Sequence, residues 1–104
     1  MNPHFWLTFP CSNFDFFNQP DPTHGFVNYV DAATASSTGL TNITADDVIH
    51  IKVDNTTVLQ PGQNRNSVRI QSKNRYNGGL FILDVIHMPG GCSIWPAGET
   101  RIVL

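Results

Sequence analysis

The sequence predicts an all-β fold, and two observations carry this prediction. Only 13% of the 104 residues are charged, which is about half the usual share. Asn, Thr, Ser, Gly and Pro are abundant, a composition typical of turns and short strands rather than of surface helices. A chain of this length accommodates one domain at most. We therefore expect a single unit built mainly from short strands.

The first half of the chain contains one aromatic segment and one predicted strand. Residues 14–17 (FDFF) are followed by residues 18–22 (NQPDP), where two prolines prevent a helix from continuing. Residues 26–30 (FVNYV) alternate apolar and polar side chains, which predicts a strand. Residues 31–38 allow one short helical turn. No repeat or linker divides the chain.

The second half shows three further strand patterns. Residues 48–53 (VIHIKV) alternate with period 2, which predicts an apolar face turned inward and His50 and Lys52 turned outward. Residues 67–72 (SVRIQS) follow a polar loop and are also expected to form a strand. Residues 80–86 (LFILDVI) form an apolar run broken only by Asp84, which is typical of a strand covered on both faces.

Charge and hydropathy exclude two classes of partner. The net charge is −2, so no overall field attracts nucleic acid or an anionic membrane. Basic residues gather between Arg65 and Arg75, but no aromatic platform accompanies them, and we interpret them as a solvated strand face beside a loop. No stretch approaches the roughly 20 apolar residues of a membrane span. The N-terminus also lacks the features of a signal peptide, so we expect the start to be trimmed or misassigned.

The cysteines and the sequons favour an oxidising compartment. Cys11 and Cys92 either pair with each other or pair with cysteines outside this chain. Asn42 and Asn55 each begin an Asn-x-Thr acceptor triplet. Neither the cysteines nor the four histidines show the spacing of metal ligands, so we expect no metal and no cofactor.

Four segments carry a resemblance to a known family. They are residues 21–31 (DPTHGFVNYVD), 66–72 (NSVRIQS), 80–89 (LFILDVIHMP) and 92–97 (CSIWPA). In order and spacing they resemble the fungal laminarinase-like endo-1,3(4)-β-glucanases of glycoside hydrolase family 16. The resemblance implies a partial concanavalin A-like β-jelly-roll sandwich, a glycan cleft on its concave sheet, a β-glucan polysaccharide as partner and an extracellular location.

The resemblance also divides the chain. Residues 14–97 correspond to the N-terminal part of a family 16 domain, whereas residues 1–13 and 98–104 diverge from the family pattern. The tail after Ala97 begins Gly98-Glu99, which can be encoded by a common intron donor sequence. We expect residues 98–104 to be encoded by an unspliced intron, with the family pattern resuming downstream.

The catalytic pair that the resemblance implies is missing. A retaining glycosidase needs a carboxylate nucleophile and a carboxylic acid roughly 5–5.5 Å apart. In similar enzymes a Glu-x-Asp-x-x-Glu strand supplies them, and this strand should follow Trp-Pro-Ala. Glu99 is the only glutamate here, and Asp84 is interpreted as a structural carboxylate within a sheet. No residue is therefore predicted to be catalytic.

The remaining candidates are sugar contacts. Trp95 offers a ring that can stack on a sugar, while Arg69 and Asn28 offer groups that can bind ring hydroxyls. In similar enzymes the arginine of Ser-Val-Arg-Ile and the tryptophan of Trp-Pro-Ala lie on or near the cleft. The alternatives are core packing for Trp95, and a strand-face role for Arg69 and a turn role for Asn28.

We interpret the chain as a fragment of a β-glucan hydrolase that is inactive as it stands. One alternative is a β-glucan-binding module that does not hydrolyse its ligand. Another is an active enzyme that recruits Glu99 or a second chain to complete its site.

Overall fold

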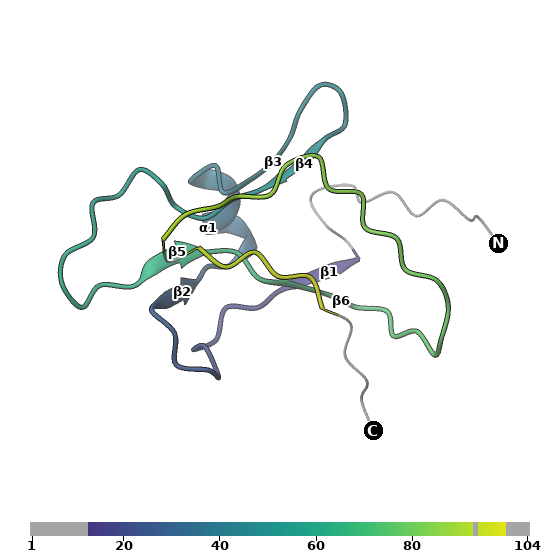
Figure 1. Cartoon of the computed structure of the whole chain (residues 1–104), viewed down its shortest axis with the longest axis horizontal. Coiled ribbons are helices and arrows are strands. Elements are labelled where there is room, and N and C mark those ends of the chain that lie inside the picture. The colour runs from purple at the N-terminus through teal and green to yellow at the C-terminus, as the bar shows by residue number, and fades with distance from the viewer. Residues whose placement is uncertain (1–12, 93, 100–104) are drawn as a thin grey trace.

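The structure is a computed structural model, and it describes residues 13–92 and 94–99. The predicted strands at residues 26–30, 48–53 and 67–72 are present, although each is shorter than expected. The described residues form six short strands and one helix. Figure 1 shows these elements joined by long loops. In chain order the elements are β1 (Phe14–Phe16), β2 (Val27–Tyr29), α1 (Ala32–Ser37), β3 (Thr41–Ile43), β4 (Ile49–Ile51), β5 (Arg65–Ser67) and β6 (Ile70–Ser72).

The described strands form three pairs. β1 lies antiparallel to β6, with Phe16 opposite Ile70, and β3 lies antiparallel to β4. β2 and β5 are parallel, with Asn28 opposite Asn66. Parallel neighbours require a crossover, and here the crossover contains α1, β3 and β4.

The chain from Arg65 to Lys73 joins the β2–β5 pair to the β1–β6 pair, and we call it the central segment. Its first part pairs with β2, and the Ser67 carbonyl also accepts a bond from the Val30 N–H. Its last part pairs with β1, and the Arg69 carbonyl accepts a bond from the Phe17 N–H at 2.8 Å. The predicted strand at residues 67–72 is therefore divided at residues 68 and 69, where the chain leaves one partner for the other.

The ends of α1 are set by local sequence. Asp31 caps the first turn, since its carboxylate accepts the Thr34 N–H at 2.8 Å. At the other end Gly39 has a φ of 73°, its N–H donates to Ser36, and the Leu40 N–H donates to the Ala35 carbonyl at 2.8 Å. This is the Schellman arrangement, which needs a residue such as glycine at the left-handed position.

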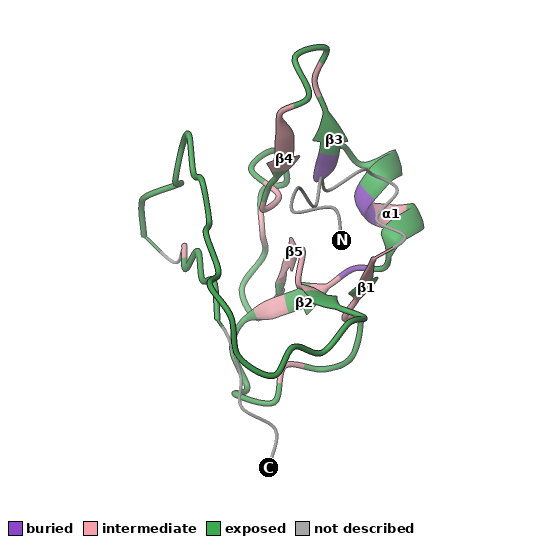
Figure 2. Cartoon of the chain, turned by 90° about the vertical axis from the view of Figure 1, so that its right-hand side faces the viewer, coloured by how far each residue is buried: buried purple, intermediate pink, exposed green. Residues whose placement is uncertain are grey.

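The core of the described part is small. Its buried members are Val30, Ala35 and Leu40, and the half-buried Phe16 and Val68 pack against them. These side chains come from β1, from α1, from the central segment, and from the residues that follow β2 and precede β3, so the core lies where these parts of the chain meet. Figure 2 shows buried residues only around α1 and the strand ends beside it.

Two expectations about strands are wrong. Residues 80–86 are irregular and largely exposed instead of forming a covered strand, because no described strand lies beside them to supply hydrogen bonds or a covering face. In β4 the expected division into faces is also absent, since Ile51 is 44% exposed while His50 is half-buried. The long exposed excursion after β6 is plain in Figure 2. Cys92 is exposed, and Cys11, one of its two possible kinds of partner, lies outside the described residues.

Candidate functional site

Arg69 lies against two aromatic rings. Its guanidinium carbon is 4.5 Å from the centroid of the Phe17 ring and 5.7 Å from that of Tyr29. The two rings meet edge to face, with centroids 5.6 Å apart and planes at 77°. Cation–π and edge-to-face contacts of this kind each hold a side chain in a defined orientation. We call these three residues the Arg69 cluster.

The cluster depends on the central segment. Phe17 directly follows β1, Tyr29 ends β2, and Arg69 lies between β5 and β6. The backbone bond from the Phe17 N–H to the Arg69 carbonyl fixes two of the three residues relative to each other. The guanidinium is consequently oriented by its neighbours while it remains half exposed and able to donate hydrogen bonds.

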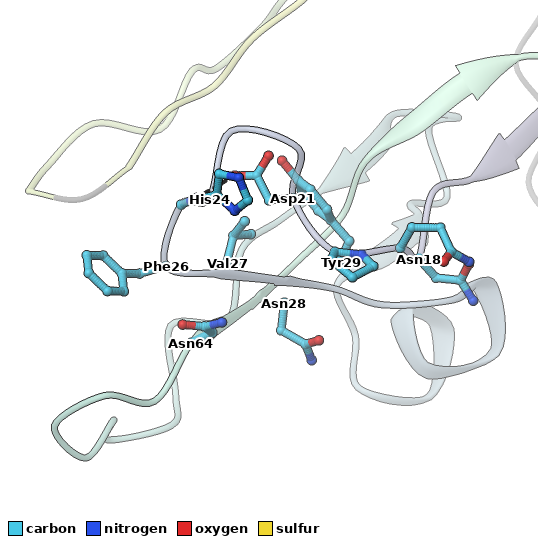
Figure 3. Close-up of a pocket in the computed structure, with 11 residues that line it drawn as sticks. Asn18, Asp21, His24, Phe26, Val27, Asn28, Tyr29 and Asn64 are labelled. Carbon is cyan, nitrogen blue, oxygen red and sulfur yellow. Dashed lines mark hydrogen bonds between the residues drawn. The ribbon is translucent and has the colours of Figure 1, made fainter.

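An open pocket of about 560 Å³ adjoins the Arg69 cluster. It is lined by residues 18–21 and 24–29 together with Asn64, and Tyr29 belongs to both the pocket and the cluster. Figure 3 shows the side chains of Asp21, His24 and Tyr29 on one side of the β2 backbone and those of Asn28 and Asn64 on the other. The lining combines aromatic rings with amide, imidazole and carboxylate groups.

A turn at Asp21 shapes one wall of this pocket. The Asp21 carboxylate accepts bonds from the Thr23 N–H at 3.0 Å, the Thr23 hydroxyl and the Gly25 N–H at 2.9 Å. These donors lower the pKa of Asp21, with the Thr23 N–H contributing most and the more distant charge of Arg69 least. His24 adopts a φ of 58°, a left-handed conformation that is uncommon for residues other than glycine.

Asn28 lies on the other face of β2 from Tyr29. Its side-chain Nδ2 donates to Oδ1 of Asn66 at 2.7 Å, directly across the β2–β5 pair. Arg69 contacts the Tyr29 ring, so the structure does not bring Arg69 and Asn28 together on one face. Asn28 nevertheless lines the pocket.

Trp95 lies apart from both groups. It follows the long irregular excursion after β6, its side chain is 89% exposed, and it belongs neither to the pocket lining nor to the Arg69 cluster. The expectation of core packing for Trp95 is therefore wrong within the described part of the chain. Its role as a sugar contact stays a prediction.

Four aspartates of the described residues do not resemble a glycosidase acid. Where the pKa of a carboxyl is displaced, at Asp21, Asp31, Asp46 and Asp54, it is displaced downward because N–H and hydroxyl groups donate to the charged form. A general acid in this chemistry needs a raised pKa. These four aspartates instead stabilise turns and the start of α1.

Neither a metal-binding cluster nor a membrane-spanning helix is present among these described residues. Over residues 13–92 and 94–99, no group of three or more His, Cys, Asp or Glu side chains is placed to hold a metal ion. No helix in that part of the chain is long and apolar enough to cross a membrane.

Sequence reasoning missed several residues at this site. Tyr29 could have been found, because period 2 places it on the same face as Val27 and next to the candidate Asn28. His24 could have been noticed in the Thr-His-Gly turn. Phe17 could not, since nothing local to residues 14–17 indicates that a ring there would lie under Arg69.

Comparison with known families identifies the chain. A sequence model of the catalytic GH16 domain matches residues 14–99, which is most of the sequence. The chain belongs to glycoside hydrolase family 16. Within that family the matching model is the one described as XgeA-like.

Curated relatives agree with this assignment. A probable endo-1,3(4)-β-glucanase of Aspergillus niger is 48% identical over 86 residues, which cover 81% of this chain and 12% of that protein. The endo-1,3(4)-β-glucanase xgeA of Emericella nidulans is 44% identical over 88 residues, or 83% of this chain and 14% of that protein. An endo-1,3(4)-β-glucanase of Arthroderma benhamiae is 42% identical, with 91% and 20% covered. The chain thus spans a small part of the relatives it matches.

Solved structures establish the fold. An elongating family 16 β-1,3-glucosyltransferase superimposes with a TM-score of 0.62 and 37% identity, covering 64% of this chain and 23% of that one. Laminarinase 16A of Phanerochaete chrysosporium, solved with β-glucans in its donor and acceptor sites, gives a TM-score of 0.57 and 47% identity, covering 62% and 22%. The predicted all-β fold, part of a β-jelly-roll sandwich, is confirmed.

Proposed function

We propose that this chain is a polysaccharide-recognising part of a β-glucan hydrolase, and that it binds glucan without cleaving it. The observation that carries the proposal is the Arg69 cluster beside an open pocket of mixed aromatic and polar lining. Sugars present apolar ring faces and hydroxyl edges, and such a lining matches both. The relatives named as endo-1,3(4)-β-glucanases support β-glucan as the ligand.

Each candidate residue has a distinct part in this binding. Arg69 offers a planar fork of donors, already oriented by two rings, to the hydroxyls of a glucosyl unit. The Asn28 Nδ2 group donates one hydrogen bond to Asn66, and the Asn28 side-chain oxygen remains available to accept one from a sugar hydroxyl. Trp95 supplies an exposed indole face for stacking.

The absence of cleavage follows from the carboxyl groups. Retaining hydrolysis requires one carboxylate to attack and one carboxylic acid to protonate the leaving oxygen, roughly 5–5.5 Å apart. This sequence contains a single glutamate, Glu99, and the displaced aspartate pKa values all favour the charged form. These four aspartates therefore cannot supply the acid that protonates the leaving oxygen, and Glu99 alone cannot supply both carboxyl groups.

We assign the function to the extracellular space. A glucan polysaccharide outside a cell is too large to cross the membrane intact, so a protein that binds such a glucan meets it there. The two Asn-x-Thr triplets support this location.

The test combines binding with hydrolysis. Wild-type chain, Arg69→Ala and Arg75→Ala would be run through native gels with and without laminarin, a β-1,3 glucan. Arg75 is an exposed arginine outside the pocket and the Arg69 cluster, so it controls for the loss of charge. We expect laminarin to retard the wild type and Arg75→Ala, and to retard Arg69→Ala at least about fivefold less.

The same proteins would be assayed for release of reducing sugar from laminarin. We expect none. Equal migration of the wild type with and without laminarin would overturn the binding proposal, and turnover that disappears in Glu99→Gln would overturn the claim that the chain does not cleave.

A further inference from the structure

The turn at residues 21–26 presents two side chains that no role above has used. Phe26 is 85% exposed although it is a large apolar residue, and it projects from the end of the turn in Figure 3. His24 lies on the same side of β2 as Tyr29. Both residues line the open pocket. An exposed phenyl ring at the edge of a polar pocket is a feature of binding surfaces rather than of a core.

The turn holds these side chains in place. The Asp21 carboxylate accepts hydrogen bonds from the N–H groups of Thr23 and Gly25. The backbone carbonyl of Asp21 accepts a hydrogen bond from the His24 N–H at 3.0 Å. A Cβ on Gly25 would stand 2.7 Å from the Asp21 Oδ2 atom, so a side chain at this position requires the Asp21 carboxylate to shift. These hydrogen bonds therefore restrict the backbone that carries the His24 and Phe26 side chains.

His24 occupies a strained position in this turn. Its φ of 58° is one that glycine or asparagine adopts more readily. Strained backbone of this kind persists where the surrounding structure enforces it, and it is concentrated at binding and catalytic sites. An imidazole here can donate from one ring nitrogen and accept at the other, which suits a sugar hydroxyl.

We propose that the turn forms a second glucan contact beside the Arg69 cluster, with the Phe26 ring stacked on one glucosyl unit and the His24 imidazole bonded to a hydroxyl of that unit. The inference rests on the proposed function, because it takes β-glucan as the ligand. The pocket volume of about 560 Å³ lies in the range of small-ligand sites. Asn18 and Asn64 in the lining can bond further hydroxyls, whereas a purely apolar partner would leave their amides unpaired.

The ring is tested with matched variants of the full chain. Phe26→Ala removes it, Phe26→Tyr keeps an aromatic face, and Val58→Ala removes an equally exposed apolar side chain, 83% accessible, outside the pocket. Dissociation constants for laminarihexaose would be measured by titration, with circular dichroism confirming that each variant keeps the wild-type spectrum. We expect Phe26→Ala to bind at least about fivefold more weakly, while Phe26→Tyr and Val58→Ala stay within about twofold of the wild type.

The imidazole is tested with His24→Gly, which fits the left-handed backbone and removes only the side chain. We expect weaker laminarihexaose binding together with unchanged or greater thermal stability. If Arg69→Ala weakens binding while Phe26→Ala and His24→Gly do not, the second contact is wrong and the proposed function stands. If the wild type binds no glucan, the proposed function and this inference are both overturned.

Discussion

The side chains of Asn28 and Asn66 join the two parallel strands of the fold, with Nδ2 of Asn28 donating to Oδ1 of Asn66 at 2.7 Å. The two residues lie directly opposite each other in the β2–β5 register. The bond therefore connects a predicted sugar contact with the central segment. The side-chain amide of Asn28 is therefore involved both in the proposed sugar contact and in the pairing of β2 with β5.

The first prediction separates these two roles of Asn28. Asn66→Ala should lower the free energy of unfolding by about 0.2–1 kcal/mol, as expected for one cross-strand pair, and it should leave glucan affinity nearly unchanged. Asn28→Ala should lower both. Chemical denaturation and laminarin titration of the two variants would measure this, and equal affinities for both variants would show that Asn28 acts only within the sheet.

The second prediction concerns the planar stacking of Arg69. Arg69→Lys keeps the positive charge but loses the flat guanidinium that lies over Phe17 and Tyr29. We expect a loss of about 0.5–1 kcal/mol in unfolding free energy, and glucan affinity intermediate between the wild type and Arg69→Ala. Arg75→Lys, at an exposed site, serves as the control. An unchanged melting temperature for Arg69→Lys would mean that charge alone accounts for the contact.

The third prediction tests the close approach of Gly25 to the Asp21 carboxylate in the turn at residues 21–26. Gly25→Ala would push a Cβ toward the Asp21 carboxylate and break the bond from the Gly25 N–H. The expected cost is about 0.5–1.5 kcal/mol of stability, accompanied by weaker glucan binding. Gly90→Ala is the matched control, since nothing lies within 4 Å of a Cβ added there. Similar melting curves for the two variants would show that Asp21 moves aside freely.

The fourth prediction is acid sensitivity. Asp21, Asp31 and Asp54 have lowered pKa values in the folded chain, so the unfolded chain binds protons first as the pH falls. The stability that these carboxylates contribute is complete above their unfolded pKa, near 4, and is lost progressively below it. Denaturation midpoints measured between pH 7 and pH 2 should fall mainly below about pH 4. A decline centred near pH 6 would show that these aspartates do not control the acid sensitivity.

The fifth prediction concerns residues 80–86. This apolar run is exposed in the described chain, so it should drive self-association when the protein is concentrated. Ile82→Asn should raise the concentration at which light scattering appears. Val58→Asn replaces a side chain of nearly the same exposure, 83% against 82%, outside the run, and should change it little. Equal effects of the two substitutions would show that general hydrophobicity is responsible.

The sequence predicted the elements whose signals are local. The alternation in residues 26–30 and 48–53 corresponds to β2 and β4, and the permitted helical turn after Asp31 corresponds to α1 with its cap. These features depend on side-chain period and on capping within a few residues. The resemblance to family 16, carried by four segments, was sufficient to give the fold class.

The errors arise where the structure depends on distant partners. The apolar run at residues 80–86 has a strand composition, but a strand needs a neighbour, and the described residues provide none beside it. Period 2 placed Asn28 and Tyr29 on opposite faces of β2, yet it could not show that Arg69 would join the Tyr29 face. Such a contact is set by the register between distant strands, which a single sequence does not encode in any local pattern.

The position of the central segment also determines when the protein can fold during synthesis. β1 and β2 have their partners in residues 65–72, so β2 cannot pair until residues 65–67 have been made, and β1 cannot pair until residues 70–72 have been made. Only α1 and the β3–β4 pair can form earlier from local contacts. Until the ribosome releases the central segment, the aromatic side chains of β1 and β2 lack the strands that pair beside them. Apolar surface exposed during this interval favours aggregation of the nascent chain.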